Sequence, residues 1–194
     1  MPWFVSDCAV NQKCRVMMKY LYHFSENGKI LQFTPRRVKV PAKRAEGMEW
    51  LNGKLVWAID SPHSPLYLFP RECPRIIIWR QPQSKAKDVA AYWHDPSKHM
   101  VAYFEENWLE RIQSTHLFRY ALPSKSFVDL KDAGMHVSDQ TVNPVNVQPV
   151  GNLLTALKDA GVEIRPIADL GGLKPAWNTS LHVSGIRLRN AQNW

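Results

Sequence analysis

The side chains best suited to chemistry gather in one short segment, residues 56–79. Its two ends, VWAI and RIIIW, have the composition of β-strand cores, while four prolines and several large polar groups lie between them. These polar or reactive residues are His63, Tyr67, Arg71, Cys73 and Arg75. Residues that bind or transform a ligand are often held on loops by a rigid scaffold, so we predict that this segment forms part of a site.

Arg71 and Arg75 flank Cys73 in the sequence PRECPR. A planar guanidinium can bind phosphate or carboxylate through two parallel hydrogen bonds, so both arginines are candidate anion ligands, together with His63 and Tyr67. The structural alternative is that the arginines cap strand ends or pair with nearby glutamates. Arginines close in space would also lower the pKa of the Cys73 thiol, but the sequence places no histidine beside it as a partner for nucleophilic catalysis.

A histidine and one of two adjacent glutamates could also take part in catalysis. His23 ends the apolar run KYLYH, where it is either a satisfied core residue or a contact to a ribose or phosphate. Glu105 and Glu106 lead into a stretch, 105–113, whose Trp108 and Ile112 share one helical face. Acids at a helix start favour its dipole, and the alternative is that one of them is a catalytic acid held near a sugar.

Length and composition indicate one soluble domain. Of the 194 residues, 45% are apolar and 22% charged, as in ordinary globular proteins. We predict a domain over residues 18–194, with residues 1–17 as an extension that it does not require. Three cysteines without a close pair favour a reducing compartment, and no apolar run approaches the ~18 residues of a membrane span, so we predict a cytoplasmic protein.

Standard catalytic and metal-binding motifs are absent from the sequence. It contains no GxSxG, no phosphate-binding GxxxxGK[ST] and no GxGxxG, so hydrolase triads and common nucleotide folds have no local support. The spacing of its cysteines and histidines does not match a zinc site, and we predict no metal.

The net charge of +8 favours an anionic partner. The densest basic cluster is RRVKVPAKR, which contributes Arg36, Arg37, Lys39, Lys43 and Arg44. This cluster lacks the interleaved aromatic residues of an RNA-binding surface. It nevertheless supports an alternative hypothesis, a non-enzymatic basic protein that binds nucleic acid or an acidic protein.

The pattern of apolar residues predicts an α+β fold with a mostly antiparallel sheet and a few short helices. Strands are expected at 19–24, 55–59, 75–79, 117–122 and 162–165, and helices at 85–93, 105–113 and 150–160. A short helical turn is expected at 64–69 and a basic loop at 35–53. Trp93, in the polar context AYWHD, is expected to be exposed.

Five pieces of the sequence resemble a bacterial family of unknown function: LYHFS, VWAIDSPHSPLYLFPRECPR, NWLERIQSTHLFRYALP, VQPVGNLL and SGIRLRNA. The resemblance covers most of the chain from Met18 onward. It implies a single fold from Lys19 to Ala191 and carries no activity.

A more distant resemblance suggests a function. A strand ending in YH, followed by a VWAI strand and a short aromatic helix, is similar to ADP-ribosyltransferase-like folds, which include the RNA 2′-phosphotransferases. The resemblance implies NAD as a cofactor, with His23 on its ribose or phosphate, Tyr67 on the short helix and the late catalytic acid within 142–149. Here Phe24 replaces a glycine common after that histidine, and Gln148, at the acid's position, cannot act as an acid or base.

On these grounds we expect a protein that binds a nucleotide, NAD or ADP-ribose, with ADP-ribosyl transfer or phosphotransfer as the activity that the resemblance implies.

Overall fold

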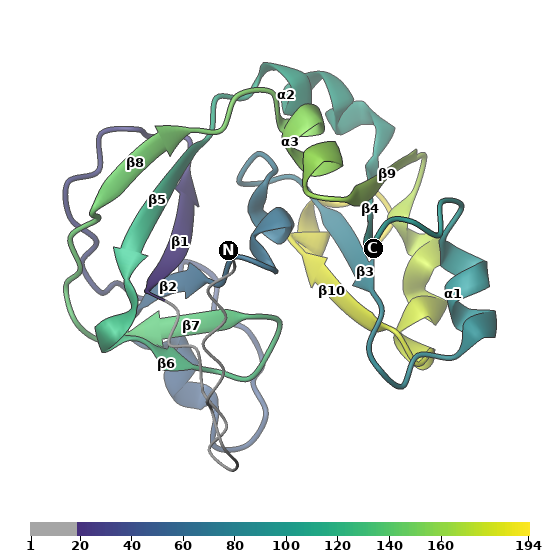
Figure 1. Ribbon diagram of the computed structural model, residues 1–194. Coiled ribbons are helices and arrows are strands. Elements are labelled where there is room, and N and C mark those ends of the chain that lie inside the picture. The colour runs from purple at the N-terminus through teal and green to yellow at the C-terminus, as the bar shows by residue number, and fades with distance from the viewer. Residues whose placement is uncertain (1–18) are drawn as a thin grey trace, which may run out of the picture.

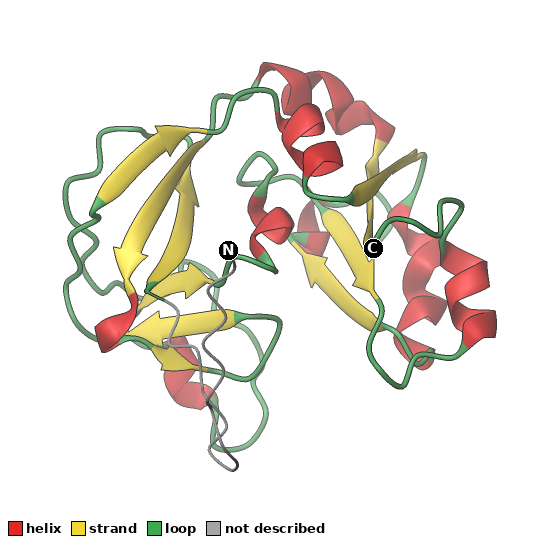
Figure 2. Cartoon of the chain, in the orientation of Figure 1, coloured by secondary structure: helices red, strands yellow, loops and turns green. Residues whose placement is uncertain are grey.

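Two β-sheets form the framework of the protein, and the segment between them carries most of the polar residues of interest (Figure 1). The computed structural model describes residues 19–194, so the extension predicted over residues 1–17 lies outside the described part of the chain. Short strands dominate, and the helices are few and brief (Figure 2). The predicted class, a single α+β domain with mostly antiparallel sheet, is confirmed.

The larger sheet has six strands in the order β6-β7-β2-β1-β5-β8, and every neighbouring pair is antiparallel. Its strands are β1 (Tyr20–Ser25), β2 (Val56–Ile59), β5 (Phe118–Pro123), β6 (Val128–Asp129), β7 (Met135–Ser138) and β8 (Asn146–Pro149). Side chains alternate between the two faces of a strand, so β1 places Leu21 and His23 on one face and Tyr22 and Phe24 on the other. Leu21 packs in a small core with Tyr120 and Phe33, whereas Tyr22 and Phe24 pack towards the smaller sheet.

The smaller sheet has four strands in the order β10-β3-β4-β9. These are β10 (His182–Ile186), β3 (Arg75–Trp79), β4 (Met100–Glu105) and β9 (Val162–Ile167), of which β4 and β9 run parallel. Every residue of the two central strands, β3 and β4, is buried, as expected for strands covered on both faces. β10 is an edge strand and is the one nearest the larger sheet (Figure 1).

Three short α-helices cover the smaller sheet and its ends. They are α1 (Ala86–Tyr92), α2 (Leu109–Ser114) and α3 (Leu153–Asp159), with 3₁₀ segments η1 (Glu49–Asn52), η2 (Ser64–Tyr67), η3 (Glu106–Trp108), η4 (Ser124–Ser126), η5 (Leu170–Asn178) and η6 (Leu188–Asn190). The Asn152 side chain caps α3 by accepting a hydrogen bond from the Thr155 N–H, and Leu153 and Leu157 bury the inner face of this helix.

One apolar core joins the two sheets. It contains Ile59 of β2, Ile77 of β3 and Phe104 of β4, with Leu66 and Phe69 of the linking segment between them. All five side chains are at most 2% exposed. The segment that carries the candidate site residues is therefore pinned at its apolar positions, which gives its polar residues a fixed frame.

Several sequence predictions need correction. The helical segment expected at 105–113 starts one residue later, because Glu105 still belongs to β4. It consists of the 3₁₀ turn η3 followed directly by α2. Trp93 is buried, since its ring packs on the smaller sheet and its Nε1 donates to the Lys98 carbonyl. The strands β4, β6, β7, β8 and β10 were not predicted.

Candidate functional site

The linking segment, residues 60–74, connects β2 of the larger sheet to β3 of the smaller one. Prolines limit its backbone freedom, and Pro65 lies in the first turn of η2, which buries Leu66 and presents Tyr67. The sequence thus places its polar residues between the two sheets, within reach of both.

A pocket of about 330 Å³ lies beside this segment. Trp57 of β2 and Tyr67 of η2 supply aromatic walls, Asp132 and Met135 supply the side of the larger sheet, and strand β10 supplies the side of the smaller sheet. A volume of this order is at the lower end of small-ligand sites.

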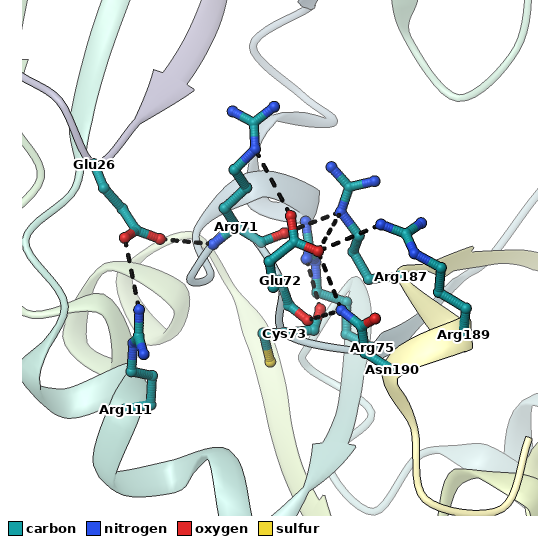
Figure 3. A network of polar contacts seen from close by, with 9 residues as sticks. All are labelled: Glu26, Arg71, Glu72, Cys73, Arg75, Arg111, Arg187, Arg189 and Asn190. Atoms are coloured by element: carbon teal, nitrogen blue, oxygen red, sulfur yellow. Dashed lines mark hydrogen bonds and ion pairs between the residues drawn. The ribbon is translucent and has the colours of Figure 1, made fainter. Parts of the chain in front are cut away.

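An arginine cluster next to the pocket is centred on Glu72 (Figure 3). Ion pairs join its carboxylate to Arg187 Nε at 3.6 Å and Arg189 Nη2 at 3.3 Å, and Arg71 Nε lies 3.8 Å away. Asn190 Nδ2 donates to the main-chain carbonyl of Glu72 at 2.7 Å and to its carboxylate at 3.2 Å. The motifs PRECPR and SGIRLRN, more than one hundred residues apart in the chain, therefore meet around one carboxylate.

A second glutamate ties the cluster to the larger sheet. Glu26, which follows β1, accepts a hydrogen bond from the Arg71 main-chain N–H at 2.9 Å and lies 3.9 Å from Arg111 (Figure 3). Four arginines thus share two carboxylates, which leaves an excess of two positive charges (4 − 2). Such an excess attracts anions.

The outer ends of two arginines are free to bind something else. Within the described residues, the hydrogen bonds and ion pairs of the side chains of Arg71 and Arg187 use only Nε. Figure 3 shows the terminal amino groups of both guanidinium groups pointing away from Glu72. Glu72 therefore binds the Nε atoms of these two side chains and leaves their terminal amino groups available as hydrogen-bond donors.

Burial by itself would raise the pKa of Glu72. The hydrogen bond from Asn190 and the charges of Arg187, Arg189 and Arg71 outweigh burial and hold this pKa below its usual range. Glu72 is accordingly ionised at neutral pH and keeps its partners in place.

Arg75 has a structural role rather than the predicted role of an anion ligand. Its side chain is buried, and it donates from Nε to the Leu66 carbonyl and from Nη1 to the Cys73 carbonyl, both at 2.9 Å. The guanidinium also lies over the rings of Tyr67 and Phe69 at 5.7 and 5.2 Å. Burial lowers the pKa of Arg75 to about 10, so it remains a cation at neutral pH.

The arginines that flank Cys73 in the sequence do not lower the pKa of its thiol. The thiol is buried, and burial raises its pKa to about 12 despite the opposing charge of Arg75. A thiol with this pKa is a poor nucleophile at neutral pH.

We therefore predict that Cys73 resists thiol reagents in the native protein. In a Cys8→Ser/Cys14→Ser variant, where it is the only cysteine, labelling by a disulfide reagent at pH 8 should be at least about 100-fold slower than in urea. Absorbance of the released thiolate measures the rate. Equal rates in the two conditions would contradict the burial of Cys73.

His63 forms a pair with Asp60 at the end of β2. Its Nδ1 lies 2.8 and 3.0 Å from the two carboxylate oxygens, and its main-chain N–H donates to the same carboxylate. The His63 ring packs against Trp79, whose indole also stacks on His182 with ring centroids 3.9 Å apart. His182 lines the pocket, whereas His63 does not. Trp79 and His182 therefore lie between the His63 ring and the pocket.

Tyr67 is the predicted site residue that does line the pocket. Its hydroxyl donates to Met135 Sδ at 3.4 Å. Burial raises its pKa, while the charges of Arg75 and Arg187 oppose that rise, so the phenol stays neutral near pH 7. Ile186 lines the same pocket, and the residue after it, Arg187, belongs to the arginine cluster, so the pocket wall and the cluster are adjacent along the chain.

His23 and Gln148, the residues at the catalytic positions that the distant resemblance implies, do not share a site. His23, Tyr120 and Val147 lie opposite one another across β1, β5 and β8, so Gln148, the next residue along β8, points to the other face of the sheet. His23 Nδ1 bonds the Trp57 carbonyl at 2.9 Å, and burial lowers its pKa. Gln148 is exposed and accepts a hydrogen bond from Arg119.

Glu105 stands at the N-cap position of η3, but its side chain makes no capping hydrogen bond. It is 1% exposed at the end of β4, and its Oε1 accepts a hydrogen bond from the Gln192 main-chain N–H at 2.9 Å. The carboxylate therefore fixes the C-terminal segment that carries Arg187 and Arg189.

The basic segment 36–44 reaches the pocket through one residue. Arg44 lines it and lies over the Trp57 ring at 5.7 Å. Arg36 forms a main-chain bridge with Leu55, and the side chains of Arg37, Lys39 and Lys43 are exposed.

Comparison with known proteins identifies the family of this chain. The model of a family of unknown function, DUF6886, matches residues 22–191, which is most of the chain. The chain belongs to this family. No curated protein and no solved structure matches it.

The match confirms the resemblance to a family of unknown function and spans both sheets, so the matched residues include the pocket lining and the arginine cluster. Within residues 19–194, no helix is long and apolar enough to cross a membrane. The same residues contain no group of three or more histidine, cysteine, aspartate or glutamate side chains placed to hold a metal.

Sequence reasoning missed several residues of the site, among them Trp57, Asp132, His182 and Arg187. Two of them belong to motifs that carried the resemblance, VWAI and SGIRLRNA, so the signal for them was present. Asp132 and His182 had no local signal, because an aspartate in a turn and a histidine at a strand start are common surface residues.

Proposed function

We propose that this protein binds a phosphorylated small molecule in the pocket between its sheets, and that nucleotides, NAD and ADP-ribose form the ligand class. The observation that carries the proposal is the pair of guanidinium groups of Arg71 and Arg187, whose terminal amino groups have no partner among the described residues and whose cluster begins directly after Ile186 of the pocket wall. A fork of N–H donors held in place by other contacts matches the geometry of a phosphate group.

The remaining walls of the pocket fit the rest of such a ligand. Trp57 and Tyr67 offer apolar ring surface, Arg44 adds a cation, and Asp132 offers a carboxylate acceptor. The proposal concerns binding. A transfer reaction that needs His23 and Gln148 on one side of the substrate has no support from their positions, because they point to opposite faces of the larger sheet.

Isothermal titration calorimetry with ADP-ribose, NAD and ATP tests the proposal. Arg71→Gln and Arg187→Gln should each weaken binding about 10- to 100-fold, which is the worth of a hydrogen bond to a charged group. Arg37→Gln makes the same change of charge on an exposed side chain of the basic segment and should change affinity less than about threefold.

The two arginine variants keep most of the side-chain volume, and thermal unfolding would check that they fold. Absence of binding by all three ligands would refute the proposal. The proposal would also fail if Arg37→Gln weakened binding as much as Arg187→Gln, because the affinity would then depend on the net charge of the protein and not on a phosphate site.

A further inference from the structure

All five residues of strand β10, from His182 to Ile186, line the pocket. Side chains of a strand alternate between its faces, so a pocket against one face would touch every second residue. A pocket that touches five consecutive residues lies instead against the edge of the strand. The wall supplied by β10 is therefore a main-chain edge.

Among residues 19–194, this edge has no pairing partner within the sheet. β10 is the outermost strand, and its ladder runs to β3 on one side only. On the other side an edge strand presents N–H donors and C=O acceptors with no ladder partner. Each outward-facing residue offers one donor and one acceptor side by side.

We infer that the open edge of β10 recognises a nucleobase through main-chain hydrogen bonds, while Arg71 and Arg187 hold the phosphate of the same molecule. The inference rests on the proposed function and names the part of the ligand that the arginines do not explain. Nucleobases carry adjacent donors and acceptors on one planar edge, which is the pattern that complements a strand edge.

The layout of the chain supports this order of contacts. β10 spans roughly 13 Å, about 3.3 Å for each of its steps, which is long enough for a nucleoside to lie beside it. The next residue, Arg187, has a φ of 57° and turns the chain so that its Nε donates to the Arg71 carbonyl at 3.2 Å. The strand edge therefore leads directly into the arginine cluster.

The other walls suit a planar ring better than an extended peptide. Trp57 and Tyr67 face the same space as the strand edge, and aromatic side chains contribute stacking to bound bases. A volume of about 330 Å³ is at the lower end of small-molecule sites, and its two aromatic walls offer flat surface to a planar ring.

The test compares ligands that differ only in the base. Calorimetry would measure the affinities of AMP, GMP, CMP and UMP against ribose 5-phosphate, which has the same sugar and phosphate. At least one nucleotide should bind tenfold or more tightly than ribose 5-phosphate. Arg187→Gln should weaken both kinds of ligand and leave that ratio within about threefold of its value in the unaltered protein, because the arginine contacts the shared phosphate.

Hydrogen exchange of the full chain gives the second readout. The outward-facing amides of residues 182–186 should exchange at least tenfold more slowly with the preferred nucleotide, whereas ribose 5-phosphate should leave them unchanged. If ribose 5-phosphate binds as tightly as every nucleotide, and β10 gains no protection, the base subsite is refuted while the proposed function stands. If no phosphorylated ligand binds, the proposed function fails as well. Protection of β10 by an acidic peptide but by no nucleotide would also overturn the inference.

Discussion

Replacement of Arg75 by methionine is expected to lower the free energy of unfolding by about 2–4 kcal/mol, because two buried carbonyl groups lose their donors. Those acceptors are the carbonyls of Leu66 and Cys73, and the Arg75 side chain is only 2% exposed. Methionine keeps much of the side-chain volume, so the loss reports the hydrogen bonds rather than a large cavity. Urea unfolding followed by tryptophan fluorescence measures the change.

The matched control is Arg37→Met. Arg37 is exposed, and the same substitution there should change stability by less than about 0.5 kcal/mol. Arg75→Lys distinguishes charge from geometry, since an ammonium group cannot span both carbonyls as the guanidinium does. If Arg75→Lys were as stable as the unaltered protein, the fork geometry assigned to Arg75 would be incorrect.

Replacement of Gly134 by alanine is expected to destabilise the protein by about 2–4 kcal/mol, from a left-handed backbone and a steric collision. Gly134 has a φ of 68°, and a Cβ atom there would lie 2.4 Å from His63 Nδ1 and 2.5 Å from Asp60 Oδ1. The substitution should therefore also separate His63 from Asp60. Thermal and urea unfolding measure the stability, and the NMR signals of the His63 ring report the lost pairing.

Gly47→Ala is the control for backbone strain. Gly47 has a φ of 79°, and a Cβ atom there would have no neighbour within 4 Å. Gly47→Ala should lower the free energy of unfolding by only about 1–2 kcal/mol, the penalty of a left-handed residue. Equal losses at the two glycines would mean that the segment around Gly134 relaxes and that the collision with His63 and Asp60 contributes nothing.

Arg75 and Gly134 both help to fix the linking segment in place. The linking segment between the sheets is held by hydrogen bonds from within, with Arg75 at one end and the Asp60–His63 pair at the other. Tyr67 and Arg71, which lie between these anchors in the chain, are left to face the pocket and the solvent. Rigid support for a few exposed donors and rings is what a preorganised binding site requires.

The elements with strong apolar patterns could be predicted from the sequence. The runs VWAI and RIIIW became β2 and β3, and the stripe of leucines at 153–157 became α3. Strands such as β8 and β10 were not predictable in this way. β8 is exposed along its whole length, and β10 is only partly covered, so neither shows the periodic burial on which such predictions depend.

The site was predicted only in part. Residue types identified Tyr67 and Arg71 as candidates, and the motif around Arg187 was noted without a role. Arg75 and Cys73 lie in the same short motif as Arg71, PRECPR, yet both are buried. Burial depends on which residues pack above the segment, and that information is not local.

The sequence by itself determined the class of the fold, its family and the segment in which polar residues concentrate, because these follow from apolar periodicity and motifs close together in the chain. Only the tertiary structure decided which of those residues share a site. Strand register placed His23 and Gln148 on opposite faces of one sheet, and the return of the C-terminal segment brought Arg187 to Arg71. Both outcomes depend on contacts between residues far apart in the chain, which a linear pattern does not specify.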